Sequence, residues 1–222
     1  MTMGEGGAVY TANPLLHRIV RSLRDWGRDC ICAPGQDNLC GHRFDGQRGQ
    51  LPKGYDHKYV YSHFGYNLKA TDMQAAVGCA QIEKMPSFAE RRRHNFARLR
   101  ELLVQGGAEE KLLLPYAQEG SDPSWFGFLM TCRQGVAREP LVRFIEGSGV
   151  QTRMLFAGNL IKHPCFDQLR EEGSGYRVVG DLANTDRIMA DSFWVGVYPG
   201  MTDEKLERIA QVILEGLRRE QD

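Results

Sequence analysis

Three cysteines close together in a loop-like stretch constrain the fold of this chain more than any other feature. Cys30, Cys32 and Cys40 fall within eleven residues. The surrounding segment, residues 28–58, holds five glycines and two prolines without helical or strand periodicity, and a structureless segment this long in a compact protein is usually functional. Thiolates are soft, strongly donating ligands that bind zinc and iron–sulfur clusters, so three of them close together in sequence favour such a metal centre. Three cysteines supply one ligand fewer than the four of a tetrahedral set. The alternative is three unconnected loop thiols in a reducing compartment.

Composition excludes several classes of protein. The 222 residues carry 28 Lys and Arg against 28 Asp and Glu, and the one basic run, residues 91–93, suits a solvated helix face, so nucleic acid is a poor candidate partner. No basic region followed by an apolar run opens the chain, and no apolar stretch approaches the roughly 18 residues of a membrane span. We therefore expect a cytoplasmic protein with reduced thiols, in which Cys79, Cys132 and Cys165 are packing residues.

Local signals predict a short strand and three helices in the first half. Residues 8–11 follow a glycine-rich turn and read as a strand. Asn13 and Pro14 begin a helix whose apolar residues recur at helical spacing until residue 27. A capping box at residues 71–74 begins a second helix that Pro86 ends, and a similar pair at residues 87–90 begins a third.

Strands and helices alternate in the second half. We expect strands at 125–132, 151–156 and 195–198, helices at about 140–147 and 181–193, and a terminal helix capped by Thr202, all after a loop-like stretch over residues 105–123. This order predicts a small α/β domain.

Four segments carry a family resemblance. The run from His63 to Ala76, with its Gly-Tyr-Asn and Asp-x-Gln-Ala-Ala elements, resembles the signature of the DegT/DnrJ/EryC/StrS sugar aminotransferases, and residues 4–9, 149–153 and 194–200 resemble further segments of that family in the same order. The resemblance implies the C-terminal part of a fold type I PLP-dependent transferase. Residues 1–86, including the cysteine loop 28–58, would end the large cofactor-binding domain. Residues 87–222 would form a connecting helix and the small α/β domain.

The cysteine spacing narrows the resemblance to one branch. Together with residues 61–67 and 155–160, it is similar to the CDP-4-keto-6-deoxyglucose 3-dehydrases of lipopolysaccharide biosynthesis. That branch implies pyridoxamine or pyridoxal 5'-phosphate, a [2Fe–2S] cluster, a nucleotide-sugar substrate, a homodimer and an NADH-dependent iron–sulfur flavoprotein reductase as electron donor. Its catalytic histidine, which replaces a cofactor lysine, and its fourth cluster cysteine would lie before Met1, so we expect a fragment that is inactive alone.

The same resemblance assigns roles to five residues. Asn67 would reach across the dimer to the cofactor phosphate, although an Asn after Gly-Tyr is also common in turns. Arg153 would pair with the substrate diphosphate, although a lone arginine is also a common surface ion pair. Cys30, Cys32 and Cys40 would hold the cluster, with a structural zinc site as the alternative. Two other functions stay open: a sugar aminotransferase, if the upstream residue is lysine, and a non-catalytic metal-binding or dimerisation module.

Overall fold

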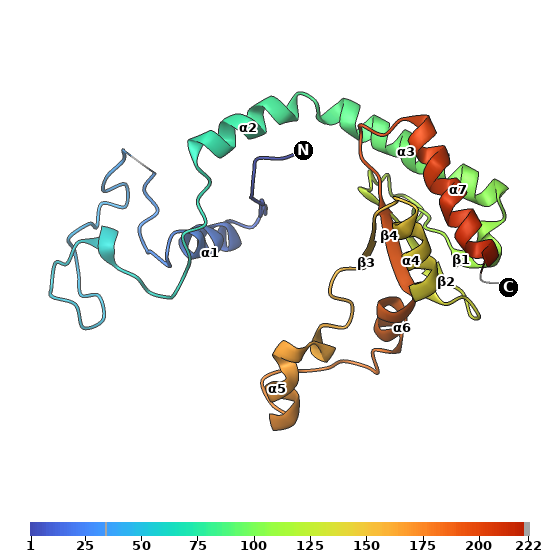
Figure 1. Ribbon diagram of the computed structural model, residues 1–222. Coiled ribbons are helices and arrows are strands. Elements are labelled where there is room, and N and C mark those ends of the chain that lie inside the picture. Colours follow the sequence, from blue (N-terminus) through green and yellow to red (C-terminus); the bar gives the residue numbers. More distant parts are fainter. Residues whose placement is uncertain (34, 220–222) are drawn as a thin grey trace. The chain divides into compact units, whose positions relative to one another are not determined.

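The computed structural model describes residues 1–33 and 35–219 and divides the chain into two compact units, Met1–Lys84 and Met85–Asp222 (Figure 1). The N-terminal unit contains α1 (Pro14–Arg24), the 3-10 helix η1 (His57–Tyr59) and α2 (Asp72–Ile82). The C-terminal unit contains, in chain order, α3 (Met85–Gln105), η2 (Ala108–Glu110), β1 (Leu112–Leu113), β2 (Gly127–Cys132), α4 (Arg138–Gly147), β3 (Thr152–Met154), η3 (Leu160–Lys162), η4 (Pro164–Phe166), α5 (Asp167–Glu172), α6 (Ala183–Asp191), β4 (Ser192–Gly196) and α7 (Asp203–Arg219).

The helix starts of the N-terminal unit follow from local chemistry. Asn13 Oδ1 accepts hydrogen bonds from the N–H groups of Leu15 and Leu16 at 2.9 and 3.3 Å, and Thr71 forms the predicted capping box with Gln74. Two local predictions are wrong. Residues 8–11 form no strand, and α3 begins at Met85 instead of Ser87, because a proline in the first helical turn lacks only an N–H that would have no partner there.

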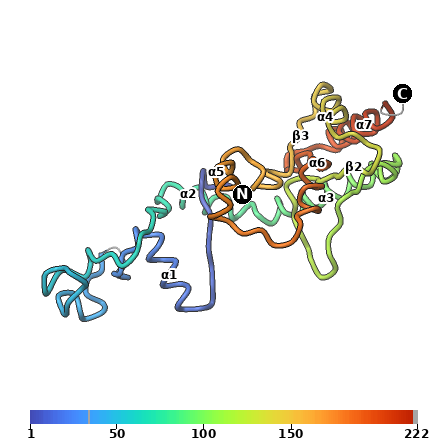
Figure 2. Tube along the Cα trace, turned by 90° about the horizontal axis from the view of Figure 1, so that it is seen from below, coloured from blue at the N-terminus to red at the C-terminus, as the bar shows by residue number. Residues whose placement is uncertain are grey.

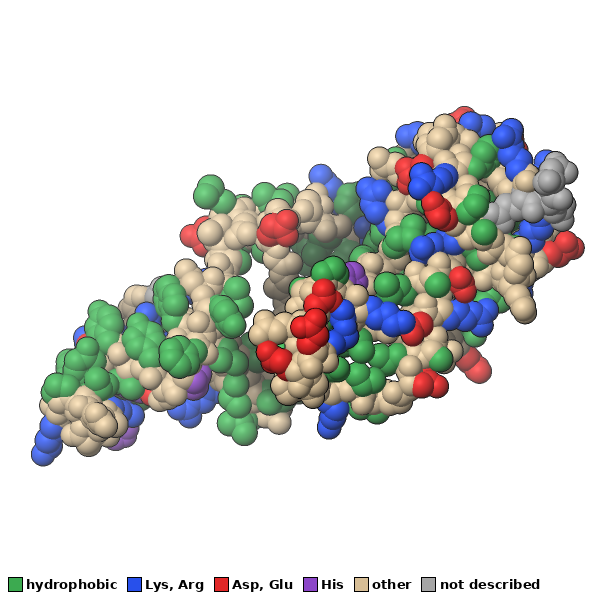
Figure 3. Space-filling model, turned by 60° about the horizontal axis from the view of Figure 1, so that its bottom comes forward, with side chains coloured by type: hydrophobic (Ala, Val, Ile, Leu, Met, Phe, Trp, Pro, Cys, Tyr) green, Lys and Arg blue, Asp and Glu red, His purple; other side chains and the backbone are tan. Residues whose placement is uncertain are grey.

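The N-terminal unit has almost no hydrophobic core. Val60 is the one buried apolar residue among those described there. The apolar face of α1 stays at the surface, where Leu15 and Leu16 are 64% and 49% exposed, and Figure 3 shows hydrophobic side chains gathered over the surface of this unit. Burial of apolar area drives folding, so this unit owes little of its order to its own packing.

The C-terminal unit is built on an antiparallel sheet in the order β1-β2-β4-β3. Alternate residues of β2 and β4, among them Phe128, Met130 and Phe193, are fully buried and pack in one core with residues of α3, α4 and α7. Figure 2 shows α4 and α7 together, and α3 also contacts α7. This arrangement agrees with the predicted α/β class.

Several boundaries differ from prediction. The predicted helix over 181–193 ends at Asp191, and the strand expected at 195–198 begins at Ser192, because Phe193 and Val195 alternate into the core. Residues 112–113, expected to lie in a loop, form β1. Between β3 and α6 the chain leaves the sheet in an excursion that carries α5 (Figure 1).

The cysteines outside the loop behave differently from one another. Cys132 is buried in the core as predicted, whereas Cys79 and Cys165 are exposed. The predicted packing role is therefore wrong for these two, because the apolar residues around them in sequence are not buried around them in space. Within the described residues, no helix is both long and apolar enough to cross a bilayer.

Candidate functional site

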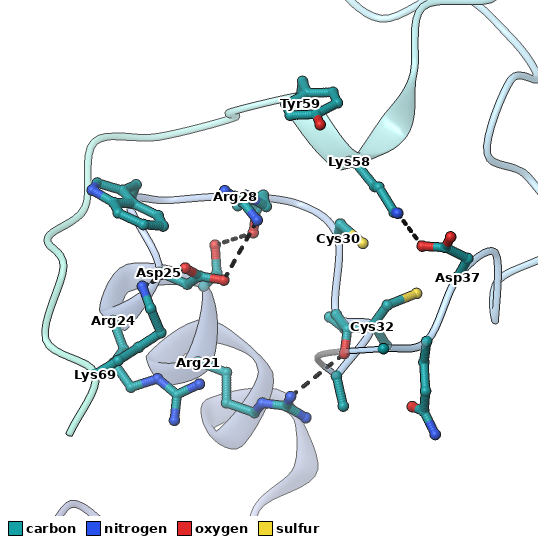
Figure 4. Close-up of a pocket in the computed structure, with 16 residues that line it drawn as sticks. Arg21, Arg24, Asp25, Arg28, Cys30, Cys32, Asp37, Lys58, Tyr59 and Lys69 are labelled. Atoms are coloured by element: carbon teal, nitrogen blue, oxygen red, sulfur yellow. Dashed lines mark hydrogen bonds and ion pairs between the residues drawn. The ribbon is translucent and has the colours of Figure 1, made fainter. Parts of the chain in front are cut away.

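A cationic cavity lies where the end of α1 meets the cysteine loop (Figure 4). Its volume is about 400 Å³. Two carboxylates, Asp25 and Asp37, line it, but the cationic side chains are more numerous: Arg21, Arg24, Arg28, Lys58 and Lys69. Because the whole chain is electrically neutral, this excess of positive charge is a local feature that favours an anionic ligand or partner.

Two of the three predicted metal ligands share this cavity. Cys30 and Cys32 both line it, and Figure 4 shows the two side chains near each other at this cavity. Burial, the largest cause, raises the pKa of the Cys30 thiol above its usual value, and the neighbouring Cys32 thiol adds to the increase. The structure therefore brings together a pair of thiols, as a shared metal centre requires.

Cys40 lies apart from that pair. Its Sγ is 3.6 Å from His57 Nδ1 and accepts the N–H of His42 at 3.4 Å. Among the described residues no three His, Cys, Asp or Glu side chains come together as a metal site. The residues present thus fit part of a thiolate ligand set, and Cys40 would have to move to complete it.

Ion pairs hold the loop in this arrangement. Arg43 binds both oxygens of Asp56 at 3.1 and 2.8 Å, and its side-chain hydrogen bond is the main cause that lowers the pKa of Asp56. Lys58 Nζ binds Oδ1 of Asp37, and this contact is the main cause that lowers the pKa of that carboxyl. Both carboxylates are thus stabilised in their charged form, and the two ion pairs connect the middle of the loop, at residues 37 and 43, to its end at residues 56–58.

Asn67 is positioned by close backbone approach to the turn after α1. The N–H groups of Tyr66 and Leu68 donate to carbonyls of Leu23 and Arg24 at 2.7 and 3.0 Å. A Cβ on Gly65 would come within 2.6 Å of the Leu23 carbonyl oxygen. The Gly-Tyr-Asn element therefore needs its glycine for packing, and the result is that Asn67 lies next to the cationic cavity.

The side chain of Asn67 is oriented by Lys69. Lys69 Nζ donates to Asn67 Oδ1 at 2.6 Å and to Asp25 Oδ1 at 2.9 Å, and it lies 3.6 Å from the centre of the Trp26 ring. An ammonium can only donate, so the carbonyl end of the amide faces Lys69. Within the described residues Asn67 Nδ2 makes no hydrogen bond, which leaves the amide N–H groups available to an anion.

Arg153 belongs to the C-terminal unit, on β3. Its guanidinium donates to the carbonyl of Thr152 at 2.8 Å, the residue is exposed, and it forms no ion pair with a described carboxylate. It lines a cavity of about 750 Å³ together with Trp194, Tyr198 and Arg208. The surface ion pair considered as an alternative is thus not formed here, and the guanidinium is accessible to a ligand.

A family model decides the assignment. The sequence model of the family described as DegT/DnrJ/EryC1/StrS aminotransferase family matches residues 1–214 of the chain. The chain belongs to this family. The resemblance found in the sequence motifs is confirmed.

Curated relatives extend over nearly the whole chain. A Salmonella typhimurium protein named lipopolysaccharide biosynthesis protein RfbH is 56% identical over 94% of this chain and 47% of its own length. The dTDP-4-dehydro-2,6-dideoxy-D-glucose 3-dehydratase of Saccharopolyspora spinosa is 50% identical over 97% of this chain and 45% of its own length. The chain therefore spans about half the length of these relatives.

Solved structures confirm the fold of this family member. An aminotransferase from Psychrobacter cryohalolentis matches 96% of the chain and 51% of its own length, with a TM-score of 0.68 and 18% identity. A GDP-4-keto-6-deoxymannose-3-dehydratase solved with a trapped PLP-glutamate geminal diamine matches 91% of the chain and 49% of its own length, with a TM-score of 0.65 and 21% identity. The predicted fold type I transferase architecture is thus confirmed.

Sequence reasoning missed part of the site. The sequence analysis assigned no role to Lys69 or Trp26, although the position of Lys69 in the sequence predicts its place in the site. Residues i and i+2 of an extended segment lie on the same side, which places Lys69 beside Asn67. Trp26 carried no comparable signal, because its place depends on a left-handed turn, with φ of 61°, between segments far apart in sequence.

Proposed function

We propose that this chain is part of a pyridoxamine-phosphate-dependent 3-dehydratase that removes the C3 hydroxyl of a CDP-linked 4-keto-6-deoxyhexose on the route to O-antigen dideoxysugars. The observation that carries the proposal is the 50% identity, over 97% of the chain, with a relative named as a sugar 3-dehydratase. Because the chain spans about half of such relatives, the activity belongs to the whole protein. We further propose that this protein is a cytoplasmic homodimer.

The residues of the N-terminal unit fit a phosphate group. When bound, pyridoxamine phosphate supplies the electron-accepting ring on which the substrate reacts. Asn67 would donate its amide N–H to a phosphate oxygen, and Lys69 fixes the amide in the orientation that allows this. In the C-terminal unit, Arg153 would pair with the substrate diphosphate through an accessible guanidinium. Both roles are binding and orientation, so the proton-transferring group has to come from outside these residues.

The cysteine loop would hold a [2Fe–2S] cluster. A cluster of this kind transfers single electrons, which an NADH-dependent iron–sulfur flavoprotein reductase would supply. Cys30 and Cys32 already line one cavity, Cys40 would join them by a local change in the loop, and a fourth ligand would come from the rest of the protein. The cationic side chains around the thiol pair would favour an anionic cluster and an acidic partner surface.

A chimera tests this proposal. We would join the part of the Salmonella relative that this chain does not match to residues 1–222, then reconstitute the product anaerobically with iron and sulfide. The expected result is two irons and two sulfides per subunit. Serine at Cys30, Cys32 or Cys40 should abolish cluster formation, while serine at the exposed Cys79 should leave it intact. Zinc in place of iron after anaerobic purification would contradict the cluster, and the cysteine loop would then be structural.

A further inference from the structure

Three aromatic rings surround a second cavity in the C-terminal unit. Phe126, Phe156 and Trp194 lie with ring centres 5.3 to 6.5 Å apart at a cavity of about 420 Å³. Phe193 and Val195 point from β4 into the core, so Trp194 between them is on the opposite face of the sheet. Phe126 and Phe156 are 56% and 72% exposed. The described residues that line this cavity include no Asp, Glu, Lys, Arg or His.

The Trp194 side chain is fixed in place, and the part of it that a ligand can contact is a face of the indole ring. Its indole N–H donates to the carbonyl of Met154 at 2.9 Å. The ring covers Gly127, where a Cβ would come within 2.5 Å of Cε3. With the N–H satisfied and one face covered by backbone, the remaining face of a fixed indole suits a flat partner.

Phe156 places a second ring beside Trp194, and its backbone is strained. Its φ is 46°, a conformation that is uncommon for a bulky residue, and such strain is concentrated at ligand-binding and active sites. The strained turn places the Phe156 ring 6.2 Å from the Trp194 ring while most of its surface stays exposed. The two rings therefore form one apolar, aromatic recess.

A cation adjoins this recess. Arg153 pairs with Trp194 in the register of β3 and β4, and Trp194 also lines the cavity that contains Arg153. An apolar aromatic surface thus lies next to an accessible guanidinium. The ligand that matches both is a flat aromatic ring joined to an anionic group.

We propose that this recess binds the base of the nucleoside diphosphate, with the base stacked on Trp194 beside Phe156 and the diphosphate directed to Arg153. Stacking of bases on aromatic side chains accepts every base because each has a π face, so the recess supplies affinity for the nucleotide part and orients the sugar. The assignment rests on the proposed function, because it names the part of the nucleotide-sugar that the C-terminal unit holds.

Titration of the 222-residue chain tests the recess directly. CDP, cytidine and inorganic diphosphate would be added at up to millimolar concentrations, with the NMR signal of the Trp194 indole N–H as readout. CDP should shift this signal, and Phe156→Asn, which retains a residue that tolerates positive φ, should weaken CDP binding about tenfold, as expected for a lost stacking contact. The matched control Phe44→Asn changes an exposed phenylalanine of the other unit and should have no effect.

Arg153→Met separates the two parts of the recess. It should weaken binding of CDP and of diphosphate and leave cytidine unchanged. A Trp194 signal that CDP does not move at millimolar concentration, or a Phe156→Asn chain that binds CDP as wild type does, would overturn the assignment.

The chimera distinguishes this inference from the proposed function. If the chimera dehydrates its substrate and Phe156→Asn raises KM about tenfold with kcat retained, both stand. If Phe156→Asn leaves KM unchanged but lowers the melting temperature, the recess is covered by protein and the inference is wrong while the function stands. If CDP binds the chain and the chimera does not dehydrate, the function is wrong and the recess remains a nucleotide site.

Discussion

Cutting the chain between Lys84 and Met85 should yield one fragment that folds and one that does not. The hydrophobic core lies entirely in the C-terminal unit, where Leu99, Leu103 and Phe128 are fully buried among the residues described. The N-terminal unit buries a single described apolar side chain, Val60. Each fully buried Leu, Ile, Val, Phe or Met side chain stabilises by about 1.5–3 kcal/mol, so the gain from burial is concentrated in residues 85–222.

The size of this effect can be measured within the folding fragment. In residues 85–222, Leu99→Ala removes a fully buried side chain from the interface of α3 with α7, at a cost of about 2–5 kcal/mol. For a domain of this size 1 kcal/mol shifts the melting temperature by about 3–5 °C, so we expect circular dichroism to show a decrease of about 6–25 °C. The control Leu113→Ala, at a position 38% exposed on β1, should shift it far less. A fragment 1–84 that melts cooperatively alone, or a fragment 85–222 that does not, would refute the reasoning.

Three further predictions concern the site. Gly65→Ala should place a Cβ against backbone atoms of the turn after α1 and destabilise that contact by about 1–3 kcal/mol, measured as lost amide protection at residues 66 and 68. The control Gly78→Ala should leave this protection unchanged, because its Cβ would meet only the Met3 side chain, at an ordinary contact distance of 3.9 Å. Asn67→Ala in the chimera should weaken cofactor binding by about 1.5–3 kcal/mol, and an unchanged affinity would remove it from the phosphate role. The pKa of Asp56 is lowered by Arg43, so the pair's contribution to loop order is complete above the unfolded pKa of about 3.9 and is lost as the pH falls through the lower folded value. The Nε–H signal of Arg43 should therefore persist at pH 5 and disappear only below about pH 4, and its loss near pH 6 would contradict this assignment.

Signals carried by neighbouring residues predicted most helices correctly. The side chains of Asn13 and Thr71 accept hydrogen bonds from N–H groups two or three residues further along the chain. The starts of these two helices therefore depend only on neighbouring residues, which the sequence shows directly. The start of α3 was wrong because Ser87 and Glu90 imitate a cap inside a helix that Pro86 can begin. Local chemistry therefore gave the existence of the helices more securely than their ends.

Features that depend on distant residues were the ones that sequence reasoning missed. Leu112–Leu113 becomes a strand only because residues 131–132 pair with it, and Phe193 leaves the predicted helix because the core receives its ring. The same limit applies to the site. Cysteine spacing predicted a shared centre, but whether Cys40 joins Cys30 and Cys32 depends on the ion pairs that hold the loop.

The product formed by the chimera tests the proposed function most directly. Supplied with pyridoxamine phosphate, a CDP-4-keto-6-deoxyhexose, NADH and an iron–sulfur flavoprotein reductase, it should release a 3-deoxy sugar that carries no amino group, identified by mass spectrometry and NMR. Residues 1–222 alone should form no product. A 4-amino sugar formed at the expense of an amino-acid donor, with the C3 hydroxyl retained, would show that the protein is an aminotransferase and would contradict the proposal.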